Sequence, residues 1–289
     1  METWIGESMY NSLQAKLERR FSGGFSFLAS YTWSHAMDDA ANPGIGGGPP
    51  YRNTNLIPLK DEMTNSNYDV RHRFTFNGLY DLPFGKGRRY VNQGGVLDYF
   101  VGGWSASATW QAQTGIPFTV GTGANTFQSA AGLINVNAIR VGDPFKGGGT
   151  PPAANIDMQG VTCPATVHNR TNWYNPCAFV DPAPGSSIAP GALLTDEASA
   201  IKYGGGKANQ IHGPGYERVN MSLFKNFPTW REQYVQFRAD AFNLFNTPSL
   251  GQPGDQNLDA TSGQITNPQS FQNYTPDARF FQLAAKYVF

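Results

Sequence analysis

The chain contains no long apolar run and little charge. No stretch of about 18 consecutive apolar residues occurs in its 289 residues, so the sequence offers no candidate transmembrane helix. Charged residues make up only 15%, against roughly 25% in ordinary soluble domains. Lysine plus arginine number 21, and so do aspartate plus glutamate, so no basic field favours a nucleic-acid partner.

A recognisable export signal is also missing from residues 1–8, which contain neither a basic region nor an apolar one. We therefore expect the true beginning of an exported protein to lie upstream. Aromatic residues are abundant at 13%, together with 33 glycines and 20 prolines. This composition is typical of a β-protein with long irregular loops. Low mean hydropathy does not exclude a membrane location, because barrel strands alternate apolar and polar residues.

The C-terminal residues form the clearest pattern in the chain. Counting back from Phe289, every second residue is apolar, and Gln282 and Lys286 lie between them. About ten residues of period 2 predict a strand long enough to cross a bilayer when tilted. An amphipathic edge strand of a soluble β-protein is the alternative interpretation. The apolar positions are Phe281, Leu283, Ala285, Tyr287 and Phe289.

Six earlier segments alternate in the same way. Their apolar and aromatic residues alternate with hydroxyls, amides and charges, which suits lipid on one face and water or a plug on the other. The first two flank the sequence Ser22-Gly23-Gly24, which is typical of a β-hairpin turn. The six segments lie at residues 10–20, 25–34, 71–82, 103–113, 219–227 and 235–241.

Short and long connections between these seven strands alternate without a break. The short ones are residues 22–24 and 228–233 and the medium turn 83–95, and the long ones are 35–70, 114–217 and 246–277. In an antiparallel meander all the short turns then fall on one side and all the long loops on the other. This is the layout of an outer-membrane barrel, with short periplasmic turns and long extracellular loops. We therefore predict an all-β fold, in which about seven meandering strands form part of an antiparallel transmembrane β-barrel.

Five stretches, in order along the chain, carry a family resemblance. They are residues 10–24, 29–34, 68–74, 213–220 and 237–246, the last reading Phe-Arg-Ala-Asp-Ala-Phe-Asn-Leu-Phe-Asn. They resemble the barrel of TonB-dependent outer-membrane receptors, and more narrowly the Oar-like group, which carries an N-terminal carboxypeptidase-regulatory-like domain. The resemblance implies a 22-stranded barrel with an N-terminal plug. Residues 1–289 would be its C-terminal part, because no plug or signal peptide is found in the sequence.

The resemblance also implies a function and a set of partners. The function would be energy-coupled uptake of a scarce nutrient across the outer membrane of a Gram-negative cell, without a catalytic role or a cofactor. The partners would be outer-membrane lipid, the barrel-assembly machinery, the remaining strands and plug of the parent chain, and TonB through the missing N-terminal part. The assembly machinery would read the C-terminal signal, which comprises Phe281, Leu283, Tyr287 and Phe289.

The two cysteines, Cys163 and Cys177, both lie in the longest predicted loop. In an oxidising compartment an even pair of cysteines most simply forms a disulfide. Free thiols remain an alternative. A metal site with the intervening His168 is another, although the spacing lacks a C-x-x-C motif.

The long loops exceed the length expected of idle connections, and we expect them to fold over the barrel mouth and contact a ligand. The alternative is that these loops are solvated and bind no ligand. Aromatic loop residues are the candidate ligand contacts: Tyr51, Trp173, Tyr174 and Tyr274.

Three other function classes stay open. One is a passive porin, adhesin or other structural barrel. Another is an outer-membrane hydrolase with a site near His35, Asp38 and Asp39, although no motif ties a nucleophile to them. A soluble carbohydrate-binding β-domain is the third.

Overall fold

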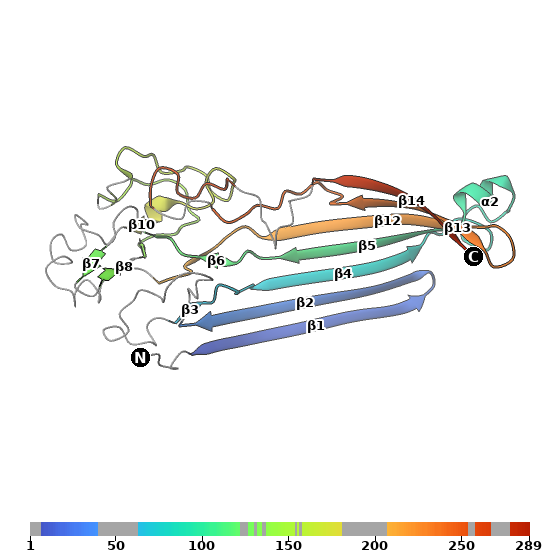
Figure 1. Ribbon diagram of the computed structural model, residues 1–289, viewed down its shortest axis with the longest axis horizontal. Helices are drawn as coiled ribbons and strands as arrows, with labels where there is room; N and C mark the ends of the chain where they lie inside the picture. The colour runs from blue at the N-terminus through green and yellow to red at the C-terminus, as the bar shows by residue number, and fades with distance from the viewer. Residues whose placement is uncertain are drawn as a thin grey trace.

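Seven long strands form one antiparallel meander in the computed structural model (Figure 1). The structure describes residues 7–39, 63–121, 127–129, 132–134, 137–153, 155, 158–180, 207–253, 258–266 and 278–289. Each long strand pairs with the next one along the chain, as the sequence predicts. They are β1 (Ser8–Ser22), β2 (Phe25–Asp38), β4 (His72–Asp81), β5 (Trp104–Gln113), β12 (Tyr216–Pro228), β13 (Tyr234–Phe242) and β14 (Phe280–Val288).

The register of the sheet keeps apolar and polar residues on opposite faces. Ala29 pairs with Phe76, and Phe76 pairs with Trp110, so apolar side chains line up across three strands. One position along, Thr75 pairs with Gln111, which continues a polar row on the other face. We call these the outward face and the inward face. Their separation confirms the predicted period of 2.

The short connections gather at one end of the sheet and the long ones at the other (Figure 1). The turn between β1 and β2 uses Gly23 and Gly24, whose φ angles of 63° and 83° lie in the left-handed region. Two such residues in succession are what a two-residue hairpin turn of type I′ requires. A side chain at either position would strain this turn.

The outer edges of β1 and β14 have no partner strand within the described residues, so the sheet is open there. An unpaired backbone group in hydrocarbon costs several kcal/mol. A membrane-spanning form of this sheet therefore needs a strand hydrogen-bonded along each of these two edges.

A short helix, α2 (Val96–Val101), lies at the short-turn end, immediately before β5. The sequence pattern did not predict it. No helix in the described part of the chain is both long and apolar enough to span a membrane.

The apolar core of the molecule lies in the long loops, and not in the sheet. Single-layer strands leave both faces uncovered, whereas the loops pack into a cluster of fully or nearly fully buried side chains. We call the described residues of 114–215 and 246–266 the loop subdomain. The buried cluster comprises Phe118, Val120, Ala138, Met158, Tyr174, Ala178, Phe179, Ile211 and Leu258.

Short elements give the loop subdomain its framework. The strand β6 (Pro117–Phe118) pairs with β11 (Ile211–His212), and β9 (Ile139–Arg140) pairs with β10 (Phe179–Val180). A 3-10 turn, η2 (Pro176–Ala178), precedes β10. The hairpin of β7 (Phe127–Ser129) and β8 (Gly132–Ile134) is a further element of it. Outside the subdomain, the short strand β3 (Thr64–Asn65) pairs with the end of β2. For its described residues, the long loop is therefore a folded unit.

Candidate ligand-binding site at the outer rim

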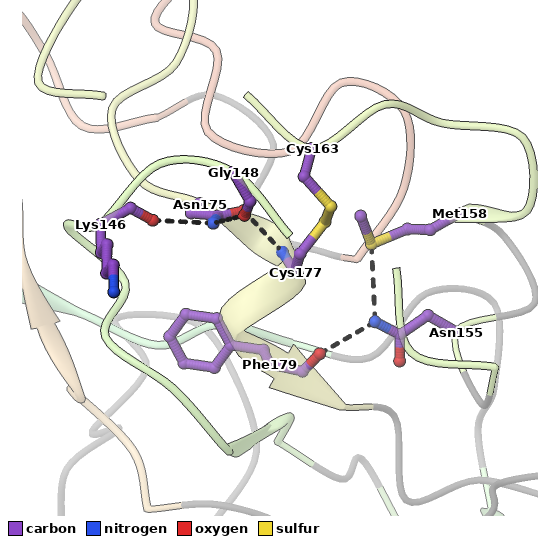
Figure 2. The surroundings of a disulfide bond; sticks show 8 residues. All are labelled: Lys146, Gly148, Asn155, Met158, Cys163, Asn175, Cys177 and Phe179. Atoms are coloured by element: carbon purple, nitrogen blue, oxygen red, sulfur yellow. Dashed lines mark hydrogen bonds between the residues drawn. A yellow bond between two sulfur atoms is a disulfide. The ribbon is translucent and has the colours of Figure 1, made fainter. Parts of the chain in front are cut away.

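A disulfide cross-links the loop subdomain (Figure 2). The structure joins Cys163 to Cys177, with their Cα atoms 6.0 Å apart. Asn175 holds the adjoining turn, because its amide donates hydrogen bonds to the carbonyl oxygens of Lys146 and Gly148 at 2.8 and 2.9 Å. Its side-chain oxygen accepts a bond from the Cys177 N–H at 3.0 Å. The cross-link and this amide together fix the loop backbone next to the buried core.

A buried carboxylate ties the end of the first long loop to the end of the second. Asp69 is 0% exposed and accepts hydrogen bonds from the backbone N–H of Ala36 at 2.8 Å and from Arg71 Nε at 2.5 Å. The Nε2 atom of His212 lies 3.3 Å from the same side chain, although 143 residues separate the two in sequence. A buried carboxylate is stable only when it is paired and hydrogen-bonded, and all three donors contribute to that here.

Asn209 strengthens this junction. Its side-chain amide donates to the carbonyl oxygen of Asn65 and to Oδ1 of Asn67, both at 2.7 Å. In return, Asn65 donates to the carbonyl oxygen of Asn209 at 3.0 Å. The two loop ends are thus held together by reciprocal amide bonds.

Burial sets the titration of His212. Desolvation lowers the pKa of its imidazole below the ordinary value of 6.5, although the hydrogen bond to Asp69 acts in the opposite direction. The charges of Arg71 and His35 lower the pKa further. His212 is therefore neutral at pH 7, and one ring nitrogen can accept a hydrogen bond.

An open pocket of about 670 Å³ lies where the outward face of the sheet meets the loop subdomain. We call it the rim pocket. Its sheet wall consists of outward-facing residues near the long-loop ends of the strands: Tyr31, His72, Phe74, Ala112 and Glu217. Its loop wall includes Phe145, His168, Trp173 and His212. The volume lies in the range usual for small-molecule sites.

Aromatic rings make up much of both walls. His168 stacks on Phe145 with ring centroids 4.4 Å apart, and it meets the Trp173 ring edge-on at 5.1 Å. On the sheet side, the Tyr31 hydroxyl is hydrogen-bonded to Nδ1 of His72 at 2.7 Å. Flat ring faces with a few polar edges suit a ligand that itself carries a ring, such as a sugar or a planar heterocycle.

The four predicted ligand contacts lie in different parts of the molecule. Trp173 lines the rim pocket, where its indole also donates to the carbonyl oxygen of His212. Tyr174 is 0% exposed and packs inside the loop core against Phe118 and Phe179, so its ring cannot reach a ligand. Trp173 and Tyr174 are consecutive in the chain, but one side chain lines the pocket and the other packs into the loop core. Tyr51 and Tyr274 lie outside the described residues.

Three residues of the predicted assembly signal share one face of β14, and the fourth, Phe289, follows the strand with its ring 6.2 Å from that of Tyr287. Their exposed fractions range from 51% to 94%, and they continue the outward face of the sheet. Reading of this segment by the assembly machinery stays a prediction. The four residues are Phe281, Leu283, Tyr287 and Phe289.

The residues considered for a hydrolase site stabilise the strand ends. Nε2 of His35 lies 3.2 Å from Oδ1 of Asn65, and the Asp39 carboxylate accepts a bond from the backbone N–H of Glu7 at 2.9 Å. Asp38 pairs with Ser8 at the end of the β1–β2 ladder. Among the described residues, no three His, Cys, Asp or Glu side chains are grouped to hold a metal ion.

Sequence reasoning missed Phe145 and His212 as wall residues of the rim pocket, and considered His168 only as a metal ligand. No local signal marks them, because their neighbours in the pocket come from other loops and strands. His212 does, however, immediately precede the stretch 213–220, which is one of the five that carry the family resemblance.

Comparison with known proteins gives one match. The family described as "Outer membrane beta barrel domain" matches residues 1–282. No curated protein and no solved structure matches the chain significantly.

Proposed function

Because the chain belongs to the outer-membrane β-barrel domain family, we propose that it forms part of the wall of a TonB-dependent receptor, of the Oar-like group, that takes up a scarce nutrient. In this proposal residues 1–289 are the C-terminal part of the barrel. The long loops capture the ligand outside the cell, and an N-terminal plug and TonB drive its release inward. The segment has no catalytic role of its own.

The observation that carries the proposal is the loop subdomain at the long-loop end, which has its own apolar core and disulfide. Such a framework holds loop residues such as Phe145, His168 and Trp173 in place before a ligand arrives, which reduces the entropy cost of binding. The rim pocket opens on the outward face of the sheet, so the proposal assigns ligand capture to the loop residues and not to the sheet wall of that pocket. A passive pore needs no such folded outer loop.

The inward face supports the presence of a plug. A hollow of about 540 Å³ on this face is lined by Lys16, Glu18 and Arg20 together with the Asn77 amide and serine and threonine hydroxyls of the next strands. Farther along the sheet, Arg238 donates to Asp240 at 2.7 Å and to Ser222 at 3.0 Å. Charges of both signs on an inner wall favour hydrogen bonds and ion pairs with a folded domain inside the barrel.

The proposed ligand carries at least one ring. Stacking on the rings of the loop residues Phe145, His168 and Trp173 would orient it, and His212 would offer a polar contact at its edge. Among the nutrient classes handled by such receptors, saccharides, cobalamin and aromatic iron chelates fit these rings, whereas a simple aliphatic peptide fits them less well.

Uptake by whole cells tests the proposal. The gene is expressed from its natural reading frame in a Gram-negative host, in cells with and without the inner-membrane energy transducer. Labelled ferric chelates, cobalamin, oligosaccharides and peptides are supplied at low concentration. We expect saturable accumulation of one class that requires the transducer, and surface binding that does not.

The opposite result would favour a passive barrel. Non-saturable entry of several small solutes at equal rates in both strains would contradict the receptor proposal. Ion conductance of the purified protein in planar bilayers would then identify a porin.

A further inference from the structure

The helix α2 lies against the outward, apolar face of the sheet. Trp104 of β5 and Lys225 of β12 are cross-strand partners on that face. The Trp104 indole donates a hydrogen bond to the carbonyl oxygen of Phe100 at 2.8 Å, and Lys225 Nζ donates to the carbonyl oxygen of Tyr99. Two neighbouring side chains of the sheet thus bind the backbone of one short helix.

The helix covers a charge that would otherwise face lipid. Lys225 is only 5% exposed although its side chain lies on the outward face. Its amine lies 5.7 Å from the ring centroid of Tyr99 and 4.8 Å from that of Phe227. A carbonyl oxygen and two aromatic faces replace the water that the amine has lost. This contact gives α2 a fixed position on the sheet.

Apart from Asp98, whose carboxylate accepts a hydrogen bond from the backbone N–H of Lys86 at 2.7 Å, the side chains of α2 are apolar or aromatic. None of its six residues is buried, and Val96, Leu97 and Phe100 are 78%, 61% and 61% exposed. Exposing each of these apolar side chains to bulk water carries an unfavourable free energy. They lie beside the lipid-facing row of the barrel wall, and so extend that apolar surface at its short-turn end.

The surroundings of α2 match the boundary of a bilayer. In the neighbouring turn Trp230 is 65% exposed, and the guanidinium of Arg231 lies 4.4 Å from its ring centroid. Lys86 and Arg89 are exposed in the same connection as α2. Aromatic rings and basic side chains next to an apolar helix are the composition of a membrane interface.

We propose that α2 is an interfacial anchor that lies in the phospholipid leaflet on the short-turn side of the membrane. Acyl chains contact Val96, Leu97 and Phe100, while Lys86 and Arg89 lie at the level of the lipid phosphates. The continuity of α2 with the lipid-facing row favours lipid as the occupant of this surface over a protein. The inference does not depend on the receptor proposal, since any barrel of this family would have the same outward face.

Lipid contact at Leu97 tests the anchor. The full-length protein with Leu97→Cys is labelled with an environment-sensitive dye, while the native disulfide is kept oxidised. It is then inserted into phosphatidylethanolamine–phosphatidylglycerol vesicles that contain brominated acyl chains. The control is Gln93→Cys, an exposed polar position in the same connection. We expect quenching by bromolipid to be about threefold stronger at position 97 than at position 93.

Equal, weak bromolipid quenching at both positions, together with quenching of the position-97 dye by aqueous iodide, would overturn the proposal. A photo-reactive amino acid at Val96 in intact cells gives a second readout if Leu97→Cys prevents folding. Cross-linked phospholipid is expected. A cross-linked protein would instead show that the surface docks a partner and would also overturn the proposal.

Discussion

The indole nitrogen of Trp173 donates a hydrogen bond to the carbonyl oxygen of His212, 2.8 Å away and 39 residues along the chain. Both residues line the rim pocket, and the His212 side chain also contacts the buried Asp69. The bond therefore connects an aromatic wall of the pocket to the network that holds the two long loops together.

Replacement of Trp173 by phenylalanine should loosen this connection while keeping an aromatic ring. One lost hydrogen bond costs about 1 kcal/mol, or about fivefold in local opening. We expect faster hydrogen exchange in residues 207–215, measured by mass spectrometry on the full-length protein. Trp230→Phe at the opposite end of the sheet is the matched control and should leave this segment unchanged. Unaltered exchange in Trp173→Phe would show that the bond does not hold the wall.

Acid should weaken the loop junction through His212. Its pKa is lowered in the folded protein, so the unfolded chain binds a proton more readily, and stability falls as the pH drops below the ordinary value of 6.5. The contribution is fully present above that value. We expect protease cleavage within residues 207–215 to rise between pH 7 and pH 5. His212→Gln should flatten this dependence, and a slope that persists in the variant would assign it to another group.

Loss of the disulfide should destabilise the loop subdomain and spare the sheet. Cys163 and Cys177 are 14 residues apart, and closing a loop of this size contributes about 3 kcal/mol in the chain-entropy model. A Cys163→Ser, Cys177→Ser double variant should show new proteolytic sites in residues 137–180. Its heat-modifiable mobility on gels, which reports the folded barrel, should not change. If the variant lost both the protease resistance of the loop subdomain and the heat-modifiable mobility of the barrel, the folding of the sheet would depend on the loops.

Charge at the middle of a strand should be tolerated on one face only. Phe76 points outward and its neighbour Asn77 points inward, at the same depth in β4. Phe76→Arg should cost about 2–4 kcal/mol in lipid vesicles, as expected for arginine facing the bilayer midplane. Asn77→Arg should cost far less in the same urea unfolding experiment. Similar costs for the two variants would contradict the assignment of the faces.

Deletion of Phe289 should reduce insertion into the outer membrane. The residue is 94% exposed directly after β14, and its ring centroid lies 6.2 Å from that of Tyr287, which shares a face with Phe281 and Leu283. The amount of folded, heat-modifiable protein in outer-membrane fractions measures insertion. Lys286→Ala, on the opposite face of β14, is the control. Equal amounts for the deletion and the control would show that the assembly machinery does not read this residue.

The long strands were predictable because their signals are local. Period-2 alternation and the Gly23-Gly24 turn act between neighbouring residues, and they locate the seven strands with small differences at the ends. β12, for example, begins at Tyr216, before the predicted residue 219. The alternation of short and long connections then gives the meander and its two ends.

The parts that were not predicted depend on distant contacts. The six residues of α2 carry no cap signal, and the helix is held by Trp104 and Lys225. The pairing of Asp69 with His212 spans 143 residues. Trp173 and Tyr174 look alike as loop aromatics, and only the folded core decides which one is buried.

The location of the apolar core outside the sheet gives the molecule two different responses to temperature. Hydrophobic burial weakens on cooling and leaves a positive heat-capacity change on unfolding, so these signatures should belong to the loop subdomain. In lipid, the strands keep their ladder hydrogen bonds because no water competes for them. The stability of the loop subdomain should therefore depend on temperature as it does in a soluble domain, whereas the stability of the strands should depend on the surrounding lipid.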